Sequence, residues 1–313
     1  MTDLPRVSII TPSYNQARFL EQSIRSVLEQ DYPNIEYILM DGGSTDDSLQ
    51  IIQKYSPRLA YWVSQPDAGQ SVAINEGLRH ATGDIWAWMN SDDAYLPGAV
   101  RKAVDWLQAN PQADIAYGDC LVMNEAGQDQ HYFHAPEFKL ESALTGAIGI
   151  PSGSTFLRKS VYDRLGGFNE SLHYSLDSDY WMRALLFCSF SHIPEALSLF
   201  RVYSAAKTWD VRQSGRRARE IVEMNQRFWH RADLPNNFRH FQSRSIANAC
   251  LFAAQLSLQA GDRTTCVRHI RKSLTMGFPA LKPRLLSLLV RLWFGERAAN
   301  VLRNLWRKGQ PAP

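Results

Sequence analysis

The sequence predicts an α/β protein whose mostly parallel sheet is flanked by helices and followed by an all-helical C-terminal region. Two observations support this prediction. Short apolar runs alternate with amphipathic stretches through residue 122, and strand signals end at about residue 241. Alternation of this kind indicates βαβ units with parallel strands and right-handed crossovers. We therefore expect two domains, residues 1–210 and 211–313, with a change of pattern between about 210 and 240.

The N-terminal domain contains this alternation throughout. Apolar residues at helical spacing predict the helices, and short apolar runs that stop at turn residues predict the strands. In chain order we expect a strand at 7–10, a helix at 17–30, a strand at 35–40, a helix around 49–52, a strand at 59–63, a helix around 74–81, a strand at 85–89, a helix at 97–107 and a strand at 113–122.

The C-terminal region shows helical patterns. Residues 216–229 predict one helix, and apolar stripes at 247–258 and 267–274 predict two more, separated by Gly261. Two stripes joined by a short turn indicate a helical hairpin, and one pair is too little to predict a solenoid.

Composition excludes several classes of protein. With 45% hydrophobic and 21% charged residues, the 313-residue chain is neither disordered nor fibrous. Its four cysteines are far apart and none forms a C-x-x-C pair, which argues against a disulfide scaffold or a structural zinc site. We find neither a signal peptide nor the ~18 uninterrupted apolar residues of a membrane-spanning helix. We expect a cytoplasmic protein.

Charge is distributed unevenly along the chain. Residues 263–313 contain eleven basic side chains and one acidic side chain, although the net charge of the whole chain is only +3. Residues 282–308 also carry Leu and Trp stripes between the basic residues. This segment either lies on an anionic membrane surface, at the inner face of the membrane, or packs on the rest of the protein. No nucleic-acid-binding motif accompanies it, so we expect no nucleic-acid partner.

Polar clusters follow three of the predicted strands, at residues 11–15, 41–44 and 90–93. Ligands of open parallel sheets bind outside the carboxyl ends of the strands, so these clusters predict a binding site. In the last cluster, Asp92 and Asp93 are adjacent carboxylates, which suit Mg²⁺ or Mn²⁺ together with substrate phosphates. The alternative to metal binding is that this pair lies in a solvated turn or caps a helix.

Two other acidic segments allow a functional and a structural interpretation. Asp41 precedes Gly42 and Gly43, which would let a base or ribose approach the backbone or would simply form a tight turn. Asp177 and Asp179 lie at a predicted helix start, where they would cap the helix, and Arg183 would pair with Asp179. The chain contains neither a dinucleotide-binding G-x-G-x-x-G motif nor a P-loop.

Several linked motifs together resemble a family-2 glycosyltransferase, an inverting enzyme of the GT-A nucleotide-sugar fold. The resemblance covers residues 5 to 208, and its motifs occur in the family's order. They are V-S-I-I-T-P-S-Y-N at 7–15, D-G-G-S-T-D at 41–46, D-A-G-Q at 67–70, N-S-D-D at 90–93, P-S-G-S-T-F at 151–156, G-G-F at 166–168 and D-S-D-Y-W-M-R at 177–183.

This resemblance implies a role for individual residues. The nucleotide would be bound by Thr11, Pro12, Tyr14, Asp41, Asp67, Asn75 and Asp92. Asp93 would be the direct ligand of a divalent metal, Mg²⁺ or Mn²⁺, with Asp92 against the ribose and the metal. Asp177 would be the catalytic base. Acceptor-side or supporting residues would be Ser154, Asp179, Arg183 and Lys207. Relatives often have a histidine where this chain has Tyr203, which leaves a third protein ligand to the metal open.

The activity implied is transfer of a sugar from a nucleoside-diphosphate sugar, with UDP favoured, to a hydroxyl of a glycan or lipid-linked acceptor. Bacterial surface polysaccharide synthesis is the expected context. The alternative is a non-catalytic donor-binding or assembly subunit that keeps the fold. A sugar-1-phosphate nucleotidyltransferase would need a Gly-rich basic loop, which residues 11–18 lack.

Overall fold

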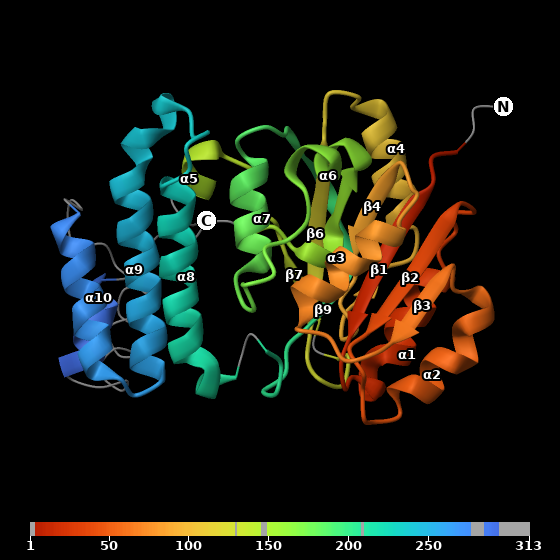
Figure 1. Ribbon diagram of the computed structural model, residues 1–313, viewed down its shortest axis with the longest axis horizontal. Helices are drawn as coiled ribbons and strands as arrows, with labels where there is room; N and C mark the ends of the chain where they lie inside the picture. Colours follow the sequence, from red (N-terminus) through yellow and green to blue (C-terminus); the bar gives the residue numbers. More distant parts are fainter. Residues whose placement is uncertain (1–3, 129, 145–148, 208–209, 277–284, 294–313) are drawn as a thin grey trace. The chain divides into compact units, whose positions relative to one another are not determined.

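A computed structural model describes residues 4–128, 130–144, 149–207, 210–276 and 285–293, and these form two compact units (Figure 1). Among the described residues, unit 1 comprises those up to Ala143 together with 149–207, and unit 2 comprises Leu144 and those from Asp210 onward. Among the described residues, no helix combines the length and apolar character that crossing a membrane requires.

Unit 1 is built on one mixed sheet with the strand order β3-β2-β1-β4-β8-β6-β9-β5, and β7 pairs with β6. Its first four strands are parallel, while β8 runs antiparallel between β4 and β6. The strands are β1 (Val7–Ser13), β2 (Ile35–Asp41), β3 (Tyr61–Ser64), β4 (Ile85–Trp88), β5 (Ala94–Tyr95), β6 (Ile115–Met123), β7 (His131–Phe133), β8 (Thr155–Arg158) and β9 (Phe190–Arg201).

Helices connect these strands. They are α1 (Ala17–Leu28), α2 (Ser48–Tyr55), α3 (Gln70–His80), α4 (Ala99–Ala109), α5 (Leu140–Leu144), α6 (Lys159–Leu165) and α7 (Leu176–Ala184). The prediction of a sheet flanked by helices is confirmed. The first four strands are parallel as expected, but the whole sheet is mixed, with four parallel and four antiparallel pairings.

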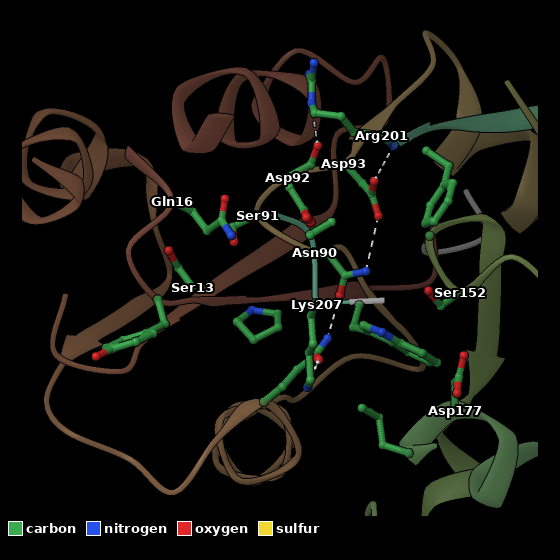
Figure 2. Close-up of a pocket in the computed structure, with 18 of the residues that line it drawn as sticks. Ser13, Gln16, Asn90, Ser91, Asp92, Asp93, Ser152, Asp177, Arg201 and Lys207 are labelled. Carbon is green, nitrogen blue, oxygen red and sulfur yellow. Dashed lines mark hydrogen bonds between the residues drawn. The ribbon is translucent and has the colours of Figure 1, made fainter. Parts of the chain in front are cut away.

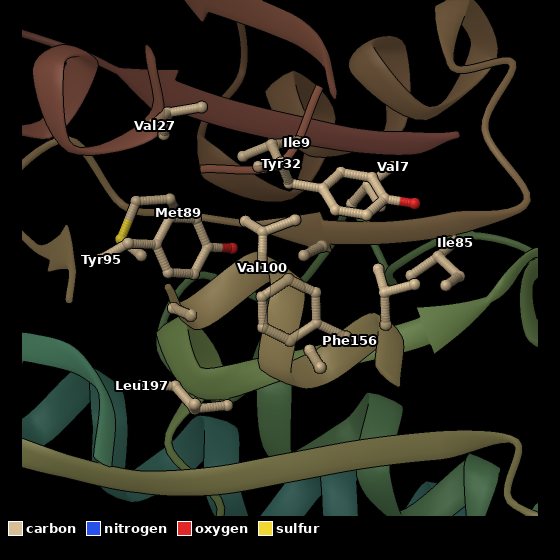
Figure 3. Close-up of a cluster of buried hydrophobic side chains, with 14 of the residues drawn as sticks. Val7, Ile9, Val27, Tyr32, Ile85, Met89, Tyr95, Val100, Phe156 and Leu197 are labelled. Carbon is tan, nitrogen blue, oxygen red and sulfur yellow. The ribbon is translucent and has the colours of Figure 1, made fainter. Parts of the chain in front are cut away.

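One face of the sheet forms the main hydrophobic core (Figure 3). Alternate residues of β1 and β4, beginning with Val7 and Ile85, point into it. They pack on the apolar stripes of α1 and α4, represented by Val27 and Val100. Removing this much apolar surface from water supplies the main driving force for folding unit 1.

The opposite face of the sheet carries an aromatic cluster. Trp86 and Trp88 alternate with the core-facing residues of β4 and contact Phe168, Tyr180 and Trp181, with ring centroids between 5.1 and 6.3 Å apart. Such offset and edge-to-face pairs add to the stabilisation from burial. The cluster fixes α7 against β4, whose carboxyl end lies beside the cavity described below.

Strands β8 and β9 were not among the elements expected from sequence. In β9, Pro194 and Glu195 interrupt the pattern, because the register on β6 jumps from Gly118↔Ile193 to Asp119↔Ala196. Proline is confined to bulges or edges of sheets, which explains why this strand gives no clear signal in the sequence.

Unit 2 is helical in its described residues. It contains α8 (Ser214–Trp229), α9 (Gln242–Gln259), α10 (Arg263–Thr275) and a helical stretch at 285–293. The stripes of α9 and α10 pack on Leu285, Leu288 and Leu292. Of the basic segment expected at 282–308, the residues other than 285–293 lie outside the described part of the chain.

Asn75 joins α3 to the loop before α7. Its Nδ2 donates to the carbonyl oxygen of Phe168 at 2.9 Å, and its Oδ1 accepts from the Phe168 N–H at 2.7 Å. A Cβ on Gly167 would lie 2.3 Å from this Oδ1, so the loop approaches as closely as it does because residue 167 is glycine. The side chain is buried.

We predict that Asn75→Ala lowers the free energy of unfolding by about 1–3 kcal/mol, because it leaves two buried backbone groups of Phe168 without a partner. Urea titration measures this loss. Arg79→Ala, on the exposed side of the same helix, is the control and should change the free energy by less than about 0.5 kcal/mol. Equal effects of the two substitutions would contradict the structural role of Asn75.

Candidate active site

A cavity of about 1480 Å³ lies within unit 1, beside the carboxyl ends of β1, β2, β3 and β4. This is where open parallel sheets place their ligands. Seven of the predicted site residues line it, namely Pro12, Tyr14, Asp67, Asp92, Asp93, Asp177 and Lys207. Figure 2 shows Asp92, Asp93, Asp177 and Lys207, which arrive from three separate segments of the chain.

Asp92 and Asp93 are held by the end of β9. Because Ala94 pairs with Leu199 in the antiparallel β5–β9 ladder, Arg201 lies opposite Asp92. The backbone N–H of Arg201 donates to Asp93 Oδ1 at 2.9 Å, and its Nε donates to the carbonyl oxygen of Asp92 at 3.0 Å. Arg201 therefore fixes the turn that carries both carboxylates.

The two carboxylates are unfavourable neighbours in this environment. Asp93 is 4% exposed. Burial, followed by the charge of Asp92, raises the pKa of Asp93 well above its usual range. Burial also raises the pKa of Asp92, against the Tyr203 hydrogen bond and the charges of Arg201 and Lys207. Desolvated like charges of this kind are typical of functional sites.

A chain of hydrogen bonds crosses the cavity from this pair (Figure 2). Asn90 Nδ2 donates to Asp93 Oδ2 at 3.2 Å, and Gln70 Nε2 donates to Asn90 Oδ1 at 2.8 Å. At the far end, Lys207 Nζ donates to Gln70 Oε1 at 3.1 Å. The end of β9 and the segment after it thus contribute Arg201 at one end of this hydrogen-bond chain and the Lys207 cation at the other.

The β1 and β2 side of the cavity is formed by loops with exposed groups. Tyr14 is 60% exposed at the cavity wall. Gly43 has φ +77, and a Cβ there would lie 2.8 Å from Pro66 N, so this approach requires glycine. Burial raises the pKa of Asp67, and the charge of Asp41 adds to the rise.

Asp177 lies in the first turn of α7 and lines the cavity. Its Oδ1 accepts the N–H of Ser178 at 2.7 Å. Burial raises the pKa of Asp177, while the Ser178 bonds and the charge of Lys207 oppose the rise. A carboxylate with a raised pKa at a cavity wall is suited to accept a proton.

The six other predicted residues do not line the cavity. Thr11 shares the core face of β1 with Ile9 and accepts a hydrogen bond from Tyr37 at 3.1 Å. Asn75 binds Phe168, as described above. Ser154 Oγ is buried and donates to the carbonyl oxygen of Asp119 at 2.7 Å.

Asp41 does not line the cavity either, but it organises the loop beside it. It is 2% exposed, and its carboxylate accepts the Ser44 N–H at 2.9 Å and the Ser64 hydroxyl at 2.6 Å. The backbone of Gly42 and Gly43 lines the cavity in its place.

The Asp179–Arg183 pair lies behind Asp177 rather than in the cavity. Arg183 Nε donates to Asp179 Oδ2 at 2.8 Å, and the guanidinium also binds the carbonyl oxygens of Leu165 and Gly167. Both side chains are largely buried. The pair attaches α7 to the preceding glycine loop and so supports the position of Asp177.

Sequence reasoning missed several residues of the cavity wall, namely Gln16, Trp88, His131 and His173. None of these residues belongs to a spacing pattern that distinguishes it, since each reaches the cavity through tertiary packing. Gln70 and Arg201 also line the cavity. Gln70 lies in the D-A-G-Q motif, and Arg201 begins a segment that resembles a phosphate-side loop of the family, but neither was given a role.

The donor set fits a divalent cation that is bound together with phosphate. Mg²⁺ and Mn²⁺ are commonly held by one or two carboxylates plus substrate phosphates and water. Asp92 and Asp93 supply such a pair of carboxylates at the cavity wall, and a bound cation would compensate their buried negative charge. Within the described residues, no group of three or more His, Cys, Asp or Glu side chains is arranged to hold a metal.

Comparisons with known proteins agree with this geometry. The model of glycosyl transferase family 2 matches residues 8–166. An uncharacterized glycosyltransferase of Mycobacterium tuberculosis is 34% identical over 193 residues, covering 60% of this chain and 72% of the relative. TuaG of Bacillus subtilis, named as a glycosyltransferase of teichuronic acid biosynthesis, is 32% identical over 148 residues, covering 46% of this chain and 59% of the relative.

Solved structures show the same fold at low sequence identity. Residues 1–349 of S. aureus TarS, in complex with UDP-GlcNAc, have a TM-score of 0.68 at 18% identity, covering 98% of this chain and 93% of that chain. A mannosyltransferase from Pyrobaculum calidifontis, in complex with GDP-Man and Mn²⁺, has a TM-score of 0.58 at 22% identity, covering 98% and 89%. The fold is therefore of the GT-A type, and the chain is a glycosyltransferase that belongs to family 2.

Proposed function

We propose that this glycosyltransferase moves a sugar from a nucleoside-diphosphate sugar to an acceptor hydroxyl by direct displacement with inversion, with Asp177 as general base. One observation carries the proposal: a single cavity is lined by the Asp92–Asp93 pair, the Lys207 cation and the Asp177 carboxylate. These are the groups needed to hold a diphosphate and to accept a proton. UDP is the favoured nucleotide, and the TarS complex with UDP-GlcNAc supports this choice.

The nucleotide would lie along the carboxyl ends of β1 and β2. Tyr14 offers an exposed ring for stacking on the base, and Pro12, Gly42 and Asp67 line the same wall. Asp41 would act indirectly, because its bonds to Ser44 and Ser64 shape the loop that the base meets. Lys207 would pair with the diphosphate.

Asp92 and Asp93 would hold a divalent metal, Mg²⁺ or Mn²⁺, against the diphosphate. Such a metal stabilises the negative charge that develops on a phosphate leaving group. The contribution of the chain is to desolvate the two carboxylates and to fix them with Arg201 and Asn90, so that neither needs to reorganise when the donor binds.

Asp177 would take the proton of the acceptor hydroxyl as this oxygen attacks the anomeric carbon. The new glycosidic bond forms as the bond from that carbon to the diphosphate oxygen breaks, and the nucleoside diphosphate leaves with the bonding electron pair. General-base assistance of this kind typically contributes about 10²–10⁴-fold to the rate. Asp179 and Arg183 would keep α7, and with it Asp177, in position.

The acceptor we propose is a glycan or lipid-linked hydroxyl in bacterial surface polysaccharide synthesis, in line with the name of TuaG. A non-catalytic subunit that keeps the fold is the other candidate. The retention of Asp92, Asp93 and Asp177 at one cavity favours the enzyme, because a binding subunit has no use for a desolvated carboxylate beside the acceptor.

We predict that Asp177→Asn abolishes transfer but changes donor affinity by less than about twofold, because the amide keeps the shape and loses the basicity. In the wild type, the raised pKa of Asp177 should place the acidic limb of kcat/KM above the usual range of an aspartate, since the base works deprotonated. Rates with each nucleotide sugar and calorimetry measure the two effects. Normal turnover by this variant would exclude Asp177 as the base.

We predict that UDP binds in the presence of Mg²⁺ or Mn²⁺ and that EDTA abolishes this binding. Asp93→Asn should remove the metal-dependent part of the affinity for UDP. Calorimetric titration of UDP, GDP and dTDP tests the binding. Unchanged affinity in Asp93→Asn would refute the metal assignment.

We also propose that unit 2 contacts an anionic membrane surface. In the helical stretch 285–293, Leu286 is 49% and Trp293 76% exposed, although the opposite side packs on α9 and α10. These two residues are seven apart and share one helix face. On α10, Arg268 and Arg271 are exposed, and α10 contains no acidic residue. An exposed apolar face in a basic unit is suited to the interface of an anionic bilayer.

We predict that full-length protein co-sediments with vesicles containing phosphatidylglycerol, and that the pair Leu286→Ser and Trp293→Ser reduces the bound fraction several-fold. Phe187→Ser, which replaces a side chain 40% exposed in unit 1, is the matched control and should change nothing. If both variants co-sedimented with the vesicles to the same extent, the proposed membrane contact would be refuted.

A further inference from the structure

We propose that the Tyr203 hydroxyl and the Gln16 amide position Asp92 so that the divalent cation is held by oxygen ligands alone, and that Mg²⁺ therefore serves this enzyme as well as Mn²⁺. The inference rests on the proposed function, in which Asp92 and Asp93 hold a metal. It adds two positioning residues and a metal preference to that site.

The first observation is a hydrogen-bond relay that ends on Asp92. Tyr203 Oη donates to Asp92 Oδ2 at 2.9 Å, and Gln16 Nε2 donates to Tyr203 Oη at 3.2 Å. Gln16 Oε1 also lies 3.5 Å from Tyr203 Oη, but the contact with Asp92 is much shorter, so the single phenolic proton is donated to the carboxylate. One oxygen of Asp92 is engaged by this relay, so the second oxygen is the one best placed to bind a cation.

The second observation is that the ring of Tyr203 is locked. It packs on Phe19 with ring centroids 5.0 Å apart, and Phe19, Tyr203 and Ala206 form a small hydrophobic cluster of their own. The guanidinium of Arg201 lies 4.5 Å from the centroid of the same Phe19 ring. Since Tyr203 is 9% exposed, its hydroxyl reaches Asp92 from a fixed direction.

The third observation concerns the remaining protein ligands. Among the described residues, no His, Cys, Asp or Glu joins Asp92 and Asp93 to make a three-membered metal cluster. The group next to Asp92 is the Tyr203 hydroxyl, which donates its proton to the carboxylate. Phosphate and water oxygens would then fill the remaining coordination positions of the cation, and these are the ligands that Mg²⁺ accepts most readily. An imidazole nitrogen would instead disfavour Mg²⁺, a hard cation that takes oxygen ligands, relative to transition-metal ions.

The test is calorimetric titration of UDP into the full-length protein with saturating Mg²⁺ or Mn²⁺. For the wild type we expect affinities with the two metals that agree within about fivefold. Tyr203→Phe should weaken UDP binding about tenfold with both metals, because a charge-assisted hydrogen bond to Asp92 is lost. Gln16→Leu should have a smaller effect of the same kind. Tyr203→His should increase the ratio of the Mn²⁺ to the Mg²⁺ affinity.

Phe19→Leu is the matched control, because it keeps an apolar side chain against the Tyr203 ring and leaves the hydroxyl and Gln16 in place. It should change UDP affinity by less than about threefold and leave the metal ratio unaltered. Unchanged binding in Tyr203→Phe, or a wild type that binds UDP far more tightly with Mn²⁺ than with Mg²⁺, would overturn the inference. A wild type that binds UDP equally well in EDTA would instead refute the metal site of the proposed function.

Discussion

Two adjacent carboxylates, Asp92 and Asp93, are held largely out of water at the carboxyl end of β4, and the architecture around the site follows from this constraint. A buried carboxylate is costly unless donors or a cation compensate it. The chain supplies donors from three directions: Asn90 from the same turn, Arg201 from the end of β9 and Tyr203 two residues later. None of them fully neutralises the pair. The site is thereby poised to accept a cation together with a diphosphate.

The same constraint links catalysis to binding. The end of β9 places Arg201 at the carboxylates, and the segment that follows places Tyr203 there and Lys207 at the far end of the Gln70–Asn90 hydrogen-bond chain. The charge of Lys207 also acts on Asp177, lowering a pKa that burial raises. Under the proposed function, donor binding would draw Lys207 toward the diphosphate and so change the electrostatic surroundings of Asp177.

The N-terminal half of the fold could be predicted from the sequence because its signals are local. The strands beginning at Val7, Ile35 and Ile85 and the α1 helix were expected within a few residues of their observed bounds. In contrast, β8 has four residues, and β9 contains Pro194 at a bulge. These two strands form because they pair with neighbouring strands of the sheet, and such long-range pairing cannot be recognised in a single sequence.

The candidate site divides in the same way. Motif residues that end strands or begin helices, such as Asp92, Asp93 and Asp177, do line the cavity. Thr11 belongs to such a motif and Asn75 lies in α3, but both point into the protein, where period-2 alternation and a contact across 93 residues decide their orientation. Gln70 lies in the D-A-G-Q motif without an assigned role, and Gln16 was not predicted, because an amide acquires a role only from the groups that packing places beside it.

The most direct test of this account is a crystal structure of the protein with UDP and Mn²⁺, using anomalous scattering to locate the metal. We expect one manganese peak in contact with Asp93 and the diphosphate, the base on Tyr14, and the terminal phosphate on the side of the cavity that Lys207 and Asp177 share. A nucleotide bound elsewhere, or a manganese site without Asp92 and Asp93, would contradict the central claim.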